Sequence, residues 1–232
     1  MNTCFVDYRI SDLELSNLYK ENLNIIQIPK SPHLYDSING HPDIQVNITS
    51  NSSIILASNS NLEISNIALK NISITYSKNK LVEKYPNNIF LNAVNLENYF
   101  IHNLKYTDEI LLSKVQEKEL INIKQGYSKC SCCIVSDNAL ITSDAGIYNS
   151  LKPYNIDVLF IPAGDISLPG LSYGFIGGSC GLISKDKLAF FGNLKNHSYE
   201  KEVKEFLFKH SVKPIYLCDT PLIDRGSILT LI

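Results

Sequence analysis

The chain has 232 residues, of which 44% are hydrophobic, 19% charged and 9% aromatic, a composition typical of a globular protein and not of a disordered, collagen-like or coiled-coil chain. Its 21 lysines and arginines against 23 aspartates and glutamates give a net charge of −2, which leaves no basic excess to bind nucleic acid or an anionic membrane surface. The length favours a single domain over two.

The first residues carry no basic segment followed by an apolar run, and no stretch approaches the roughly 20 apolar residues that span a bilayer. We therefore expect a cytoplasmic protein without membrane contact. Its six cysteines are then reduced thiols, because a chain of this length does not need disulfide bonds to hold its core.

Three elements are expected near the N-terminus: a strand at Thr3–Asp7, a helix at Ser11–Glu21 and a strand at Asn24–Ile28. A hairpin then begins at His41 with HPDIQVNI, turns at 51–53 and returns through IILAS. Apolar runs joined by a short polar turn are typical of antiparallel strands.

A second hairpin begins at Tyr85 with YPNNIFLNAV, turns at 95–97 and returns through NYFIHNL. The residues that follow predict a helix over 110–120 and an outer strand over 121–124. This region therefore contributes two paired strands, a helix and a third strand.

Two more regular units follow, at 125–162 and 171–217. Each has a glycine-containing approach, an apolar strand, a tight turn, a second strand, a helix and a third strand. The turns hold Asp137-Asn138 and Asp186-Lys187, residue types that tolerate hairpin backbone. Apolar residues at i, i+3 and i+4 predict a buried helix stripe in the second unit, at Val203, Phe206 and Leu207. Both units are ββαβ repeats.

The hairpin turns stand a regular step of about 41 to 48 residues apart, so five such steps use up the chain. The fifth unit must then be split, with a strand at Gly226–Ile232 joining the three N-terminal elements. This predicts an α/β protein with one domain over 1–232: a five-bladed β/α-propeller of ββαβ units, its ring closed by the N- and C-terminal strands. The alternative is a doubly wound α/β fold, which the hairpins disfavour because parallel strands need long crossovers.

This architecture, with the strand-leading segments QGYSKCS, GFIGGSCG and DRGSIL, resembles the pentein, or guanidino-group-modifying enzyme (GME), superfamily, and more closely an uncharacterised bacterial branch of it. The resemblance implies that acidic side chains hold a planar guanidinium, a cysteine thiolate attacks its central carbon and a histidine handles protons. It also implies that Asp43 offers its carboxylate to the substrate.

The usual nucleophile and histidine are absent from the positions that the resemblance indicates. The last inner strand, GSILT at 226–230, has no cysteine, and the fourth unit, YGFIGG at 173–178, has no histidine. Cys130 is the substitute nucleophile that we consider, with Lys129 lowering its pKa and His41 carrying protons. The alternative is that the cysteines of CSCC are ordinary buried core residues.

If the ring is correct, the residues that lead into the inner strands converge on one central mouth. The candidate catalytic residues there are Cys130 and His41. The candidate substrate-binding residues are Asp43, Gln45, Asn88, Tyr127, Lys129, Gly177, Asp224 and Arg225. We predict no metal, because CSCC lacks a second cysteine pair at zinc spacing, and no cofactor, because the glycines of 174–181 do not precede a helix.

The expected function is binding of a small polar ligand of guanidino or amidino type. If the protein turns that ligand over, the resemblance implies an amidino-group hydrolase or transferase; without turnover it would be a pseudoenzyme. The alternative is a noncatalytic protein-interaction module on the same fold. The sequence leaves both a homo-oligomer and a protein partner open.

Overall fold

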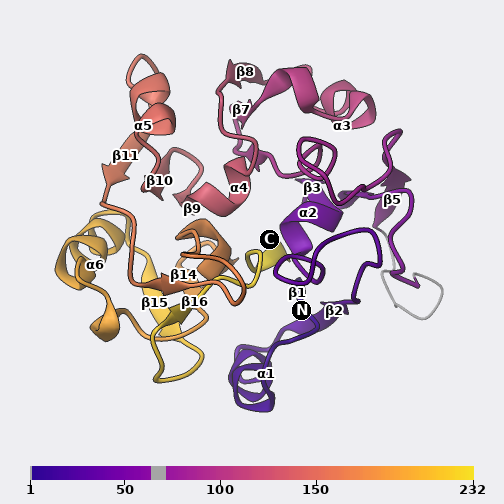
Figure 1. Cartoon of the computed structure of the whole chain (residues 1–232). Helices are drawn as coiled ribbons and strands as arrows, with labels where there is room; N and C mark the ends of the chain where they lie inside the picture. Colours follow the sequence, from indigo (N-terminus) through magenta and orange to yellow (C-terminus); the bar gives the residue numbers. More distant parts are fainter. Residues whose placement is uncertain (1, 64–71) are drawn as a thin grey trace.

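A computed structural model describes residues 2–63 and 72–232 of the chain (Figure 1). Within these residues lie five three-stranded sheets built in the same way: a first strand pairs antiparallel with a second, and the second pairs parallel with a third. Beginning with the first strand, the sheets are β17 (Leu229–Leu231), β1 (Thr3–Asp7) and β2 (Asn24–Ile28); β3 (Val46–Ser50), β4 (Ser53–Leu56) and β5 (Ser73–Tyr76); β6 (Val94–Asn95), β7 (Tyr99–His102) and β8 (Glu119–Asn122); β9 (Cys132–Ser136), β10 (Ala139–Thr142) and β11 (Asp157–Phe160); and β13 (Cys180–Ser184), β14 (Lys187–Phe190) and β15 (Lys213–Tyr216). A further parallel pair is formed by β12 (Ile166–Ser167) and β16 (Leu222–Ile223).

The two ends of the chain meet in one sheet. The last strand, β17, pairs antiparallel with β1, with Phe5 opposite Leu229 and Thr3 opposite Leu231. The predicted pairing of the terminal strands is therefore confirmed. Figure 1 shows the five sheets spread around the middle of the view, where the C-terminus lies.

In four of the five sheets a described helix makes the crossover that the parallel second and third strands require. These helices are α1 (Asp12–Tyr19), α3 (Glu109–Ser113), α5 (Ala145–Leu151) and α6 (Glu200–Lys209), with 3₁₀ turns η2 (Leu104–Tyr106) before α3 and η4 (Leu194–Asn196) before α6. These four helices lie at the periphery (Figure 1). The buried residues of α6 are Val203, Phe206 and Leu207, as the sequence spacing predicts.

Five hydrophobic clusters lie between the sheets, and each joins two of them. The clusters join the β1 sheet to the β3 sheet, the β3 sheet to the β6 sheet, the β6 sheet to the β9 sheet, the β9 sheet to the β13 sheet, and the β13 sheet to the β1 sheet. The apolar faces of every sheet are therefore covered by its two neighbours, and the helices cover the outside. Among the described residues, none of the helices has the length and apolar run needed to cross a membrane.

One sequence prediction about local structure is wrong. The helix expected over 110–120 ends at Ser113, and the outer strand expected over 121–124 begins earlier, as β8 at 119–122, because these residues pair in parallel with β7. The doubly wound alternative does not fit, as the hairpins indicate, since each of the five three-stranded sheets contains an antiparallel pair.

The segments that lead into three of the first strands are short helical turns and not extended chain. They are α2 (Pro42–Gln45), α4 (Ser128–Ser131) and η3 (Gly177–Ser179), which run directly into β3, β9 and β13. Their residues are buried. Pro42 at the first turn of α2 favours this conformation, because its ring fixes φ at a helical value. These turns bring their side chains into the middle of the molecule.

Candidate functional site

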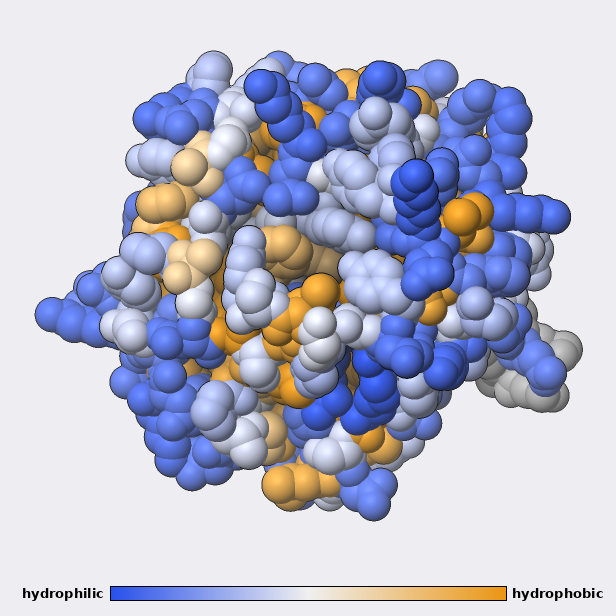
Figure 2. Space-filling view, viewed as in Figure 1, coloured by the Kyte–Doolittle hydropathy of each residue, from blue (hydrophilic) through white to orange (hydrophobic). Residues whose placement is uncertain are grey.

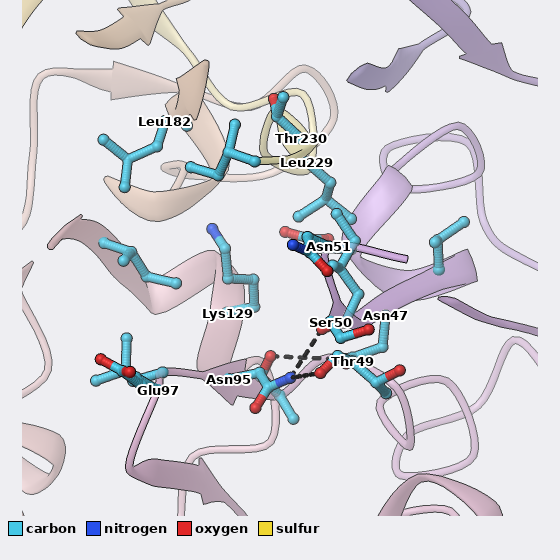
Figure 3. Close-up of a pocket in the computed structure, with 18 of the residues that line it drawn as sticks. Asn47, Thr49, Ser50, Asn51, Asn95, Glu97, Lys129, Leu182, Leu229 and Thr230 are labelled. Atoms are coloured by element: carbon cyan, nitrogen blue, oxygen red, sulfur yellow. Dashed lines mark hydrogen bonds between the residues drawn. The ribbon is translucent and has the colours of Figure 1, made fainter. Parts of the chain in front are cut away.

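A central cavity of about 620 Å³ lies where the first strands of the five sheets approach one another. Each of β3, β6, β9, β13 and β17 contributes lining residues, together with the hairpin residues Asn51, Glu97 and Asp137. Asp43 of α2 and Lys129 of α4 also border it. Figure 3 shows the Lys129 side chain reaching into the space between Leu229 and Asn95. Figure 2 shows hydrophobic residues gathered toward the middle of the face seen in Figure 1, with a mostly hydrophilic periphery.

Asp43, Lys129 and Ser227 form a buried polar chain beside this cavity. Lys129 Nζ donates to Ser227 Oγ at 3.0 Å, and Ser227 Oγ donates to Asp43 Oδ2 at 2.5 Å. Burial raises the pKa of Asp43, while the Lys129 charge opposes that rise. The chain joins three segments that are far apart in the sequence, so it exists only because the fold brings their sheets together.

The two carboxylate oxygens of Asp43 differ in their partners. Oδ2 also accepts a hydrogen bond from the Cys130 thiol at 3.0 Å. Oδ1 is buried and has no hydrogen-bond partner among the described residues. A buried polar atom without a partner costs about 1–3 kcal/mol relative to a satisfied one, so Oδ1 is a strong acceptor for a ligand that reaches it.

The His41 imidazole lies close to the Asp43 carboxylate and the Cys130 thiol. It is 1% exposed, and neither ring nitrogen has a hydrogen-bond partner among the described residues. Its Nε2 lies 4.0 Å from Asp224 Oδ1. Burial lowers the pKa of His41, so the imidazole is neutral at pH 7. Gly226, at φ +70°, makes room for this ring, because a Cβ there would lie 2.2 Å from the Cβ of His41.

The structure brings the predicted catalytic pair and the predicted anchor together: potential ligand atoms of His41, Asp43 and Cys130 all lie within 4.8 Å of one another. The prediction that Lys129 lowers the pKa of Cys130 is wrong. Burial, and then the negative charge of Asp43, raise that pKa well above the ordinary value of a thiol. Cys130 is 3% exposed and does not line the central cavity. Its thiol is therefore protonated and shielded, and the catalytic roles of Cys130 and His41 remain predictions.

Asn92 is a central residue that the sequence reasoning missed. Its Nδ2 donates to the Asp43 carbonyl at 3.1 Å and to Cys130 Sγ at 3.3 Å. Its Oδ1 accepts from the backbone N–H groups of Lys129 at 2.9 Å and of Cys130 at 3.2 Å. One side chain from the loop before β6 thus fixes α2 against α4. A single asparagine in an apolar run gives no sequence signal for this.

Ser227 was also missed. It stands in the DRGSIL segment, from which the sequence analysis takes only Asp224 and Arg225 as candidate residues and notes the absence of a cysteine. Its φ of +70° is unusual for a residue with a side chain, and its hydroxyl lies between Lys129 and Asp43. The sequence feature that could have indicated Ser227 is the Gly226-Ser227 pair just before β17, where a polar side chain points toward the centre of the molecule.

Six of the predicted substrate-binding residues do not line the central cavity. They are Gln45, Asn88, Tyr127, Gly177, Asp224 and Arg225. The reason is that the segments leading into the first strands fold into buried turns and loops, whose side chains bond within the wall. The six residues keep no contact with the cavity in the structure, so their role in binding stays a prediction.

Several of these six residues form side-chain hydrogen bonds with backbone groups. Gln45 Nε2 donates to the Asn39 carbonyl at 3.0 Å, and Arg225 Nη1 donates to the Arg9 carbonyl at 2.9 Å. Asp224 accepts from the N–H groups of Phe175 and Gly226, both at 2.9 Å. These bonds hold the loops on which the central side chains depend.

Cys132 and Cys133 behave as the core alternative predicts. Both are fully buried, and they point into two different hydrophobic clusters, on opposite sides of β9. Successive residues of a strand face opposite ways, so these two thiols cannot share one site.

Several solved structures are similar to this chain in fold. The chain is similar to a dimethylarginine dimethylaminohydrolase in an adduct with S-methyl-L-thiocitrulline (TM-score 0.56, 11% identity, 94% of this chain and 92% of that one). It is also similar to SxtG, an amidinotransferase of saxitoxin biosynthesis from Microseira wollei (TM-score 0.55, 10% identity, 94% and 88%). A third similar structure is the inosamine-phosphate amidinotransferase of Streptomyces griseus (TM-score 0.51, 10% identity, 87% and 72%).

These neighbours have the pentein fold, an α/β propeller-like architecture, and the likeness shows that this chain shares it. The resemblance to the guanidino-group-modifying superfamily is therefore confirmed at the level of fold. Residues 5–229 match the model of a family of unknown function (DUF6873), and the chain belongs to that family. No curated protein matches the chain.

Proposed function

We propose that the five sheets form a closed ring of blades and that the central cavity binds a small polar ligand with a guanidino or amidino head group. The ring is supported by the five hydrophobic clusters, which join the sheets in cyclic order. The binding site is supported by the lining, to which all five first strands contribute. A volume of about 620 Å³ suits a small molecule, since ligand pockets usually measure about 300–1,000 Å³.

The observation that carries the proposal is the unpartnered Oδ1 of Asp43, a carboxylate that borders the cavity. A planar group with several N–H donors is the best complement to a carboxylate oxygen held in a fixed direction. The positive charge of a guanidinium also favours the ionised carboxylate of Asp43, which burial disfavours. The anchor of the ligand is therefore Asp43.

The other charged groups of the lining are consistent with a cationic head group. Lys129 and Lys118 are its two cations, and both already have acceptors in the protein: Lys129 bonds Ser227, and Lys118 Nζ donates to Asn95 Oδ1 at 2.7 Å. The acidic residues Asp43, Glu97 and Asp137 outnumber them by one. The lining thus has a small negative excess.

The neighbours support the same class of ligand. Two are amidinotransferases, and one is a dimethylarginine dimethylaminohydrolase held in an adduct with S-methyl-L-thiocitrulline. We assign binding and not turnover to this chain, because the Cys130 thiol is committed to Asp43 and is shielded from the cavity. A thiol in this state is a poor nucleophile.

The test is a ligand screen by thermal shift, followed by calorimetric titration of the compounds that stabilise the protein. L-arginine, agmatine and guanidinoacetate are the probes, and citrulline is the matched control because a neutral urea group replaces the guanidinium. We expect the guanidino compounds to bind and citrulline to bind more weakly. A hydrogen bond to a charged group is worth about 1.5–3 kcal/mol, so Asp43→Asn should weaken binding about 10- to 150-fold.

Ser77→Ala is the control variant, since Ser77 is buried but does not line the cavity. It should leave the affinity unchanged. Equal affinity of a guanidino compound for the native protein and Asp43→Asn would refute the anchor. If no probe shifts the melting temperature and a macromolecule co-purifies with the chain, the interaction-module alternative is favoured.

A further inference from the structure

His41, Asp43 and Cys130 form one group of buried side chains, of which the proposed guanidino ligand contacts only Asp43. They come from the turns α2 and α4, which lead into two different sheets, and they offer one imidazole nitrogen, one carboxylate oxygen and one sulfur within 4.8 Å of one another. In contrast to the absence of metal expected from CSCC, we propose that these three residues bind a tetrahedral transition-metal ion of the zinc type beside the central cavity.

The donor set is one that zinc prefers. Histidine nitrogen, cysteine sulfur and carboxylate oxygen are its usual protein ligands, at about 2.0–2.3 Å from the ion. In a tetrahedron of those bond lengths the ligand atoms lie about 3.3–3.6 Å apart. Cys130 Sγ and Asp43 Oδ2 are already 3.0 Å apart, and the whole group falls within 4.8 Å. Small side-chain movements therefore complete the geometry.

A second, independent observation points to a ligand at this place. His41 is 1% exposed, yet both of its ring nitrogens lack a hydrogen-bond partner among the described residues. Buried polar side-chain atoms normally have partners, so an imidazole with two unused nitrogens calls for an explanation. A metal ion on one nitrogen supplies it. With the ion on Nδ1, the Nε2–H is left for Asp224, whose Oδ1 lies 4.0 Å away, and such a carboxylate orients a metal-bound imidazole.

The surrounding structure holds the three residues in place before any ion binds. Asn92 bonds both the Asp43 carbonyl and Cys130, which fixes the distance between α2 and α4. Gly226 leaves the space that the His41 ring occupies. A site whose ligands are already fixed binds a metal without a large cost of ordering them.

The charges and the released proton are accounted for when a divalent ion binds. Binding breaks the Cys130 S–H bond and forms a sulfur–metal bond, and the proton leaves to the buffer. The thiolate and the Asp43 carboxylate then neutralise a divalent ion. Asp43 borders the central cavity, which gives the ion a path to the site. Three protein ligands leave a fourth position for water or a cavity ligand.

The test is titration of the full chain, freed of metal with a chelator, with Co²⁺ alone. Cobalt takes the zinc geometry and reports its ligands by colour. We expect one equivalent to bind, with visible absorption of tetrahedral intensity and a thiolate-to-cobalt charge-transfer band in the near ultraviolet. Cys130→Ser should abolish that band and weaken Co²⁺ binding at least tenfold. Cys132→Ser is the matched control: a fully buried neighbouring thiol outside the group, which should leave both unchanged.

The proposal is overturned if native protein gives no charge-transfer band, if the band survives in Cys130→Ser, or if Cys132→Ser loses it equally. Should Cys130→Ser fail to fold by circular dichroism, X-ray absorption of the native cobalt protein decides: one sulfur in the metal shell is expected, and a shell of only nitrogen and oxygen refutes the site. The inference does not rest on the proposed ligand. Guanidino binding by the metal-free native protein without a Co²⁺ charge-transfer band would show that only the metal site is wrong, and a Co²⁺ band without guanidino binding would show that only the proposed ligand is wrong.

Discussion

Acid should destabilise the fold through His102, a residue that does not line the central cavity. His102 is fully buried at the end of β7. Its Nε2 lies 3.1 Å from the Gly126 carbonyl, so it must donate, and Nδ1 then accepts from Thr107 Oγ1 at 2.7 Å. Both nitrogens of the neutral ring are thereby satisfied. Burial lowers the pKa of His102 to about 4, from an ordinary value of 6.5.

The sign and size of the effect follow from these two values. Between pH 6.5 and 4 the unfolded chain binds a proton at His102 that the folded protein excludes, so stability falls as pH falls. The contribution lost, relative to pH 7, is about 2 kcal/mol at pH 5 and about 3 kcal/mol at pH 4. At pH 7 and above, nothing of it is lost.

The assay is urea unfolding of native protein and of His102→Gln at pH 7, 6 and 5, because other buried groups also titrate and only the difference isolates His102. Glutamine keeps one donor and one acceptor but binds no proton. We expect the stability difference between the two proteins to shrink by about 2 kcal/mol from pH 7 to pH 5. His33→Gln, at an exposed position, is the control. A difference for His102→Gln that stays constant with pH would refute the reasoning.

Three stability predictions concern the residues packed around the central polar group and those of the peripheral helix α6. Gly226→Ala forces a side chain into a positive-φ position against His41 and should lower the melting temperature by about 6–12 °C in a thermal scan. Asn92→Ala removes four buried hydrogen bonds; urea unfolding should show a loss of about 2–4 kcal/mol, and an unchanged stability would contradict its central role. Leu207→Ala should cost about 2–5 kcal/mol through a cavity, whereas Lys204→Ala, which breaks an exposed ion pair, should leave the melting temperature within about 2 °C.

The fold was predictable because its information is local and repeated. Each hairpin is marked by two apolar runs and a polar turn, and the helix stripe of α6 shows in the spacing of Val203, Phe206 and Leu207. The pairing of β1 with β17 was predictable because an unmatched unit remained at each end of the chain. The error over 110–120 arose where pairing with β7 outweighs helix propensity, which no local pattern records.

The site was predictable only in part, because its residues depend on contacts between sheets. Asp43, His41 and Cys130 could be grouped from the expected ring together with the superfamily resemblance, and the structure places them together. The direction of the Cys130 pKa was missed, because burial raises it and the nearest charge acting on the thiol is that of Asp43, which is distant in sequence and accepts its hydrogen bond, whereas the adjacent Lys129 bonds Ser227. Sequence adjacency therefore gave the wrong electrostatic partner.

The polar chain from Lys129 through Ser227 to Asp43 explains how the buried carboxyl group of Asp43 is tolerated beside the central cavity. An isolated buried carboxylate would take up a proton, since burial penalises its charge. Here a lysine and a hydroxyl stand on the Oδ2 side, and Lys129 opposes the rise in the pKa of Asp43. Oδ1 is left free of protein partners. The same arrangement that opposes protonation of Asp43 thus keeps one oxygen open, and that oxygen is the acceptor that we propose for a guanidinium.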